Sequence, residues 1–130
     1  MAPAKNLECG IAAIDHGADA VYIGASRFGA RAAAGNTLSD IKALCEYAHT
    51  FMAKVYVTVN TIIYDNELCA TKELISQLYE AGADAILVQD MALASMIASG
   101  DGLPPIPIHA STQTDNRTAD KVKWLASQGF

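Results

Sequence analysis

The chain has 130 residues, of which 52% are hydrophobic and 18% are charged, and its formal net charge is −5. This length fits one domain or part of a larger one, and the apolar content is sufficient for a core. The acidic balance argues against tight sequence-independent binding of nucleic acid by this stretch alone, because such binding relies on Lys and Arg. No apolar run is long enough for a membrane span and no signal-peptide pattern is visible, so we expect a cytoplasmic protein.

A short motif occurs twice and organises the chain. Residues 17–24 are Gly-Ala-Asp-Ala-Val-Tyr-Ile-Gly, and residues 82–89 are Gly-Ala-Asp-Ala-Ile-Leu-Val-Gln. Glycine at the first position favours the left-handed conformation that ends a helix. The apolar run after it is typical of a strand buried on both faces of a parallel sheet. Gly129 has the equivalent place after a last helix, which predicts that Phe130 begins another strand.

Helical patterns separate the strands, and each follows a residue that can cap a helix. The last of these helices should bury Val122, Leu125 and Ala126, which share one face. The first helix should end at His16, next to Gly17. The predicted caps, in chain order, are Asn6, Thr37 or Ser39, Asp65 or Asn66, Asp90, and Asp115 or Asn116.

Strands that alternate with helices predict an α/β fold with a parallel sheet and right-handed crossovers. An open doubly wound sheet and part of a (β/α)8 TIM-type barrel both fit. We favour the partial barrel, with about four complete βα units in a single α/β domain over 1–130, because no phosphate-binding G-x-G-x-x-G follows a strand. Polar residues also follow every strand, as a ring of site residues would. The expected strands are a stub at 1–4 and the segments 21–24, 54–60, 86–89 and 106–110.

Ligands bind at the carboxyl ends of the strands in either architecture. Arg27 and Arg31, in a small Gly-rich loop over 25–36, could grip an anion by forked hydrogen bonds, or they could be solvated surface residues. Asn60 could orient a ligand or close a turn. Asp90 could be a general base or only a helix cap, whereas Gln89 beside it is less easily explained by local structure.

His109 is the most informative single residue. It ends a strand and is followed by Ala-Ser-Thr-Gln-Thr, in which Ser111 and Gln113 could also bind substrate. We favour an acid, base or ligand role for His109 over a buried histidine satisfied by a neighbouring strand. No G-x-S-x-G elbow supports a Ser-His pair. His16 and His49 lie near helix C-termini and are interpreted as structural.

The three cysteines, Cys9, Cys45 and Cys69, are widely spaced and contain no CxxC pair. They fall at positions predicted to be helical. Buried thiols in a reducing compartment are therefore favoured over disulfides or a metal site. No His, Asp or Glu set has the helical spacing of a metal site, so no metal is expected in this chain.

Several collinear segments resemble the N-terminal part of the collagenase-like peptidase family U32. The resemblance covers essentially the whole chain. The Phe-Gly-Ala-Arg loop and the His-Ala-Ser-Thr-Gln segment are most similar to bacterial members that hydroxylate a cytidine of large-subunit ribosomal RNA. The segments that carry the resemblance are 17–24, 28–31, 57–62, 89–91 and 108–113.

The resemblance implies a barrel-like N-terminal domain followed by a region whose cysteines hold an iron–sulfur cluster. None of the cysteines here matches that region, so the chain is expected to be a fragment of a larger barrel protein. It implies RNA as substrate and a small anionic co-substrate, such as the dicarboxylate prephenate. Arg27 and Arg31 would hold the anion, and His109, Asn60 and Gln89 would orient the reacting group.

Three functions stay open at this stage. The whole protein is a cluster-dependent RNA hydroxylase, or it is a peptidase, for which the sequence offers no recognisable nucleophile or metal site. Alternatively the isolated 130 residues are inactive and form a folding or binding module. We expect unpaired strand edges to make this segment associate with itself.

Overall fold

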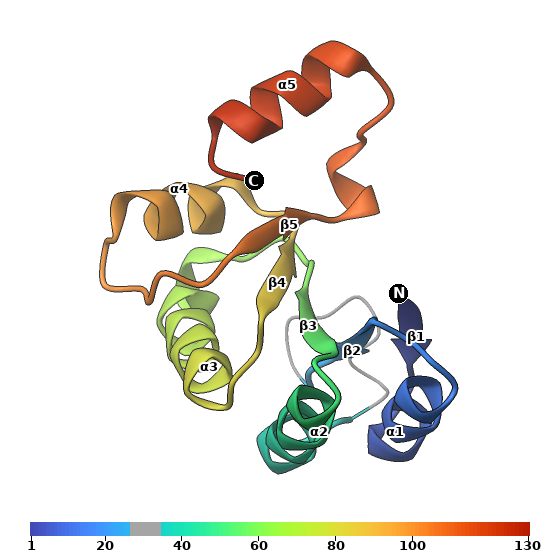
Figure 1. Cartoon of the computed structure of the whole chain (residues 1–130). Coiled ribbons are helices and arrows are strands. Elements are labelled where there is room, and N and C mark those ends of the chain that lie inside the picture. The colour runs from blue at the N-terminus through green and yellow to red at the C-terminus, as the bar shows by residue number, and fades with distance from the viewer. Residues whose placement is uncertain (27–34) are drawn as a thin grey trace.

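The computed structural model describes residues 1–26 and 35–130. Within them, parallel strands alternate with helices along the chain (Figure 1). The strands are β1 (Ala2–Ala4), β2 (Ala20–Gly24), β3 (Lys54–Val59), β4 (Ala85–Val88) and β5 (Ile108–Ala110). The helices are α1 (Leu7–Asp15), α2 (Leu38–Thr50), α3 (Leu68–Glu80), α4 (Met91–Ser99) and α5 (Ala119–Ser127), with 3-10 turns η2 (Asp65–Glu67) and η3 (Thr112–Thr114).

The order of the strands in the sheet is their order in the chain, and every neighbouring pair is parallel. A doubly wound sheet changes direction at a switch point, and the described strands show no such reversal. Successive right-handed crossovers in one direction place the helices on the same side of a sheet. Helices α1 to α4 accordingly follow one side of the row of strands in Figure 1. The fold is therefore α/β, with the consecutive strand order of a partial (β/α) barrel.

The core lies between the sheet and these helices. Alternate strand residues point to this side because side chains alternate along a strand. The residues on the opposite face, among them Tyr22, Tyr56 and Leu87, are only half-buried. Those on the helix side are 0% exposed: Val21, Ile23, Val55, Val57, Val59, Ile86 and Val88.

Three helix starts confirm the predicted caps. The Asn6 side chain accepts a hydrogen bond from the Cys9 N–H at 3.0 Å. Thr37, and not Ser39, caps α2, and it forms a capping box with Asp40. Hydrogen bonds from the Thr37 side chain and backbone lower the pKa of Asp40. Asp90 caps α4. Local sequence therefore places these helix starts correctly, as expected for contacts that span three residues.

The last helix differs from expectation at its start and on its buried face. Neither Asp115 nor Asn116 caps it; Thr118 does, and its hydroxyl accepts from the Lys121 N–H at 3.2 Å. Asp115 instead ends the turn η3 with a φ of 59°. Of the three residues expected inside, only Leu125 is buried, whereas Val122 is 52% exposed.

Three further expectations are corrected. Neither Asp65 nor Asn66 caps the third helix, because both lie in the turn η2 and α3 begins after Glu67 with no side-chain cap. The fifth strand begins at Ile108 rather than at 106; Pro107, just before it, has no N–H to give to a ladder. Only Cys45 is a buried thiol, while Cys9 and Cys69 are exposed. Burial raises the pKa of Cys45 to about 12, with smaller contributions from the charges of Asp84 and Glu46.

The glycine motif has the predicted backbone. Gly17, Gly82 and Gly129 have φ values of 89°, 91° and 95°. In each case the glycine N–H bonds the carbonyl three residues back and the next N–H bonds the carbonyl five residues back. These are the bonds that close a helix through a left-handed residue, and β2 and β4 follow the first two glycines at the same spacing.

Candidate functional site

Polar residues follow β3, β4 and β5 at one edge of the sheet. Because the strands are parallel, their carboxyl ends meet there, and ligands bind at that edge in folds of this kind. Asn60 follows β3, Gln89 follows β4, and Ser111 follows β5. The structure therefore brings these three predicted residues to the same edge.

Asn60 and Ser111 are in direct contact. The Asn60 Nδ2 donates to the Ser111 Oγ at 3.3 Å, although β3 and β5 are separated by β4. Ser111 is only 2% exposed, and its hydroxyl also accepts from the Gln113 N–H at 3.2 Å. Its substrate-binding role stays a prediction; what the structure shows is a buried hydroxyl that ties Asn60 to the end of β5.

The turn after β5 is held by the same serine. The Ser111 carbonyl accepts from the Thr114 hydroxyl at 2.7 Å and from the Asn116 Nδ2 at 3.2 Å. The Ser111 N–H donates to the Val88 carbonyl at 2.9 Å, which continues the β4–β5 ladder. Gln113, predicted to bind substrate, is exposed within this turn. The network fixes the backbone on which Gln113 stands.

Asp90 has two structural tasks. Its Oδ1 accepts from the N–H groups of Ala92 at 2.9 Å and Leu93 at 3.3 Å, which caps α4. Its Oδ2 accepts from the Ile63 N–H at 3.1 Å, which holds the segment after β3 against the end of β4. A role as general base stays a prediction, and it would have to coexist with these three backbone hydrogen bonds.

His109 lies on the half-buried face of the sheet. It is the register partner of Leu87 in β4, and His109 itself is exposed. Its imidazole meets the Tyr56 ring edge-on, with the ring centroids 4.8 Å apart. Sequence reasoning missed Tyr56, although its place on the alternate face of β3 was a signal for it. Together with residues of α5, His109 also lines a largely apolar cavity of about 290 Å³.

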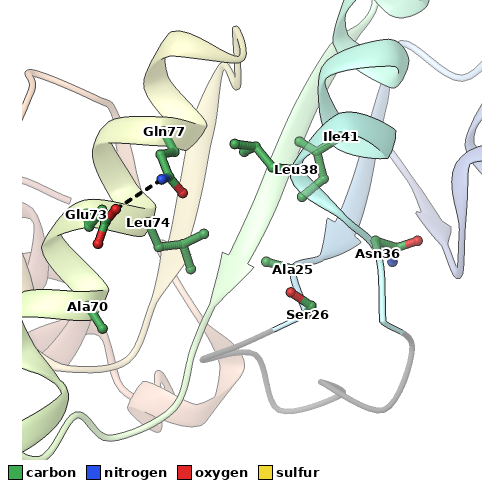
Figure 2. A pocket seen from close by; sticks show the side chains of 9 residues that line it. All are labelled: Ala25, Ser26, Asn36, Leu38, Ile41, Ala70, Glu73, Leu74 and Gln77. Carbon is green, nitrogen blue, oxygen red and sulfur yellow. Dashed lines mark hydrogen bonds between the residues drawn. The ribbon is translucent and has the colours of Figure 1, made fainter.

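Asn36 is a second residue that sequence reasoning missed. It is 4% exposed, and its Nδ2 donates to the Lys5 carbonyl at 3.0 Å and to the Gly24 carbonyl at 2.9 Å. It thereby joins the segments that follow β1 and β2. Figure 2 shows Asn36 and Ser26 beside a cavity of about 260 Å³ that α2 and α3 flank. Arg27 and Arg31 lie outside the described residues.

An ion cluster occupies the opposite edge of the sheet. The Asp84 carboxylate lies 2.8 Å from the Lys54 Nζ and 2.9 Å from the His49 Nε2, and it accepts from the Val55 N–H at 2.8 Å. Burial raises the pKa of Asp84, but the hydrogen bonds from Lys54, Val55 and His49 outweigh it and leave the pKa lowered. The structural role predicted for His49 is therefore confirmed.

The described residues contain no group of three His, Cys, Asp or Glu that could hold a metal ion. Cys9, Cys45 and Cys69 stand on α1, α2 and α3, two of them exposed and one buried. They do not fit an iron–sulfur cluster, which needs several thiolates around one centre. In the part of the chain that the structure describes, no helix has both the length and the apolarity for a membrane crossing.

The consecutive parallel sheet and its polar carboxyl edge can be compared with known proteins. The model of the family described as Peptidase family U32 matches residues 5–130. The chain belongs to this family. The match to U32 covers every described element except β1, so the family assignment rests on nearly the whole fold rather than on one motif.

Named relatives in the U32 family differ in what they do. The chain is 48% identical over all its 130 residues to the 23S rRNA 5-hydroxycytidine C2501 synthase of Escherichia coli, of which it covers 19%. It is 38% identical to the tRNA hydroxylation protein P of Helicobacter pylori over 88% of this chain and 27% of that one. It is 34% identical to a collagenase of Porphyromonas gingivalis over 97% of this chain and 30% of that one.

The chain thus spans between about a fifth and a third of the length of these relatives. No solved structure matches it.

Proposed function

We propose that this chain is the N-terminal part of an enzyme that hydroxylates RNA, with a cytidine of large-subunit ribosomal RNA as its target. The observation that carries the proposal is the 48% identity to the E. coli synthase across all 130 residues. Relatives named for tRNA hydroxylation support the same reaction class. Such an enzyme would act where ribosomal and transfer RNA are made, which is the cytoplasm of a bacterium.

The carboxyl edge would bind and orient the reactants. Asn60, Gln89 and Gln113 carry amides that donate to and accept from a base edge or a sugar hydroxyl. Their amides stand on strand ends that Ser111 and Asp90 hold in place. His109 would transfer a proton, since an imidazole ring can both accept and donate one. Arg27 and Arg31 would hold the carboxylates of a prephenate-like co-substrate by forked hydrogen bonds.

Hydroxylation also needs redox chemistry, and the resemblance assigns this to an iron–sulfur cluster. The cysteines of this chain do not fit such a cluster. We therefore assign the cluster to a part of the enzyme outside these 130 residues.

A chimera tests the proposal. In an E. coli strain that lacks the 23S rRNA 5-hydroxycytidine C2501 synthase, the matching segment of that enzyme is replaced by this chain. Mass spectrometry of 23S rRNA should show restored 5-hydroxycytidine. Replacing both Arg27 and Arg31 by Ala should then lower the modified fraction about tenfold or more, since hydrogen bonds to charged groups contribute about 1.5–3 kcal/mol each.

Lys42→Ala, on the exposed side of α2, is the matched control for charge and should leave the modification unchanged. A chimera that is made in normal amount and folded, yet leaves the cytidine unmodified, would count against a hydroxylase role for this chain.

A peptidase is the second candidate, because the collagenase of P. gingivalis is 34% identical over most of this chain. The contacts of the described residues give a peptidase mechanism little support. His16 contacts the Ala12 carbonyl, His49 contacts Asp84, and His109 contacts the Tyr56 ring. None of these partners is a Ser or Cys nucleophile. Gelatin cleavage by the purified whole protein, lost on His109→Gln, would favour the peptidase over the hydroxylase.

A further inference from the structure

The half-buried face of the sheet carries an aromatic contact that the proposed function does not yet use. Tyr56 and Ala85 are partners in the β3–β4 register, and Leu87 and His109 are partners in the β4–β5 register. All four side chains point to the same face, because paired residues in a parallel sheet share a face and residues two apart do also. Tyr56 and His109 are thus near neighbours across β4.

The small side chain of Ala85 makes the contact possible. Strands two apart in a sheet are separated by nearly 10 Å, yet the Tyr56 and His109 ring centroids are 4.8 Å apart. The intervening strand presents only a methyl group at the level of Tyr56. The phenol ring therefore leans across β4, and the interplanar angle of 70° places the two rings edge to face.

We propose that Tyr56 is a positioning residue for His109. The phenol ring restricts the imidazole to one rotamer and so presents a fixed ring nitrogen to the reactants at the carboxyl edge. The inference rests on the proposed function, in which His109 transfers a proton. His109 needs such a support, because its side chain is exposed and β5 has only three residues.

The chain supplies a matched control. Tyr22 of β2 is the register partner of Tyr56 and lies at the same level on the same half-buried face. It stands one strand further from β5. Removing the Tyr22 ring should cost similar packing but should leave the His109 rotamer unchanged.

The first experiment needs no activity. The three histidine ring signals of the 130-residue chain are recorded by NMR and assigned with His109→Gln. Tyr56→Leu should move the His109 signals, because the ring current of Tyr56 is lost, and Tyr56→Phe and Tyr22→Leu should not. If the leucine variant fails to fold by circular dichroism, Tyr56→Met takes its place. Unmoved His109 signals in a folded Tyr56→Leu would overturn the proposal.

The second experiment uses the E. coli chimera. Tyr56→Leu should lower the rate of cytidine hydroxylation about ten- to a hundredfold, since small misplacements of a reacting group can cost 10²-fold, with KM little changed. Tyr56→Phe should restore the rate. The positioning role of Tyr56 would be overturned if Tyr56→Phe also lost the rate, or if Tyr22→Leu lowered the rate as much as Tyr56→Leu. An inactive unmutated chimera would refute the proposed function alone, because the NMR result still decides the positioning of His109.

Discussion

Asp84 shows how one side chain can hold two elements. It is the third residue of the second Gly-Ala-Asp motif, and its carboxylate bonds the Val55 N–H at the start of β3 and His49 at the end of α2. Asp19 has the same place in the first motif, but there the side chain is exposed and the backbone carbonyl takes the contact, accepting from the Lys54 N–H at 3.0 Å. Identical motifs thus have different environments.

Asp84→Asn should destabilise the fold by about 1–3 kcal/mol, since the charge-assisted bonds are lost and one backbone donor is left poorly satisfied. Asp19→Asn is the matched control and should change the free energy of unfolding by less than about 0.5 kcal/mol. Urea denaturation of both variants measures the difference.

The same residue sets a pH dependence. The pKa of Asp84 is lower in the folded state than in the unfolded chain, so its contribution is fully present above the unfolded value of about 3.9. It is lost as the pH falls through the folded pKa, because the folded state must then bind a proton that it disfavours. The free energies of unfolding of the original chain and of Asp84→Asn should differ at pH 7 and converge as the pH falls below about 3.9 and through the folded pKa. A constant gap at all pH values would contradict this.

At the level of elements, Asn36 connects the segment after β1 to the segment after β2. One amide nitrogen donates to both the Lys5 and Gly24 carbonyls, and Asn36 itself pairs with Ala25 in an isolated parallel bridge. Ala25 and Asn36 therefore lie side by side next to the carboxyl end of β2. The carbonyls at these strand ends are satisfied by a side chain rather than by another strand.

Asn36→Asp tests this connection with almost no change in size. A carboxylate cannot donate, and it would face two carbonyl oxygens in a buried position, so we expect a loss of about 3 kcal/mol or more. Asn66→Asp, in the exposed turn η2, is the matched control. Thermal unfolding followed by circular dichroism compares them. Equal stability of the two variants would show that the Asn36 bonds contribute little.

At the level of the whole molecule, β1 and β5 are the outer strands of the described sheet. Unpaired strand edges are templates for pairing with another chain. Pro3 in β1 has no N–H to offer to a further strand, which limits this tendency at that edge. The Ser111 N–H bonds the Val88 carbonyl, so alternation along the ladder directs the Ala110 N–H to the free edge.

We still expect the 130-residue chain to self-associate at high concentration. Static light scattering over a concentration series should show an apparent mass that rises above 13.7 kDa. Ala110→Pro should lower this rise, because it removes a donor from the free edge of β5. A strictly monomeric, well-folded chain at all concentrations would contradict the expectation.

The order of helices and strands, the caps at Asn6, Thr37 and Asp90, and the glycine ends of the helices were all predictable from the sequence. Each depends on residues within about one helical turn, so local pattern is enough. The cap of α5 was not predictable in this way, because Asp115, Asn116 and Thr118 are all good capping residues. The turn after β5 uses the first two, which leaves Thr118 for the helix.

The α/β class, the resemblance to U32 and the residues that follow each strand could all be inferred from the amino-acid pattern. The contacts between these residues could not: the Asn60–Ser111 hydrogen bond joins residues 51 positions apart, and the Tyr56 ring contacts His109 across β4. The tertiary structure also shows the consecutive strand order rather than a doubly wound one. The physical reason is that periodicity reports which face of an element is buried, whereas contacts across the sheet depend on register and on the size of the residue between them.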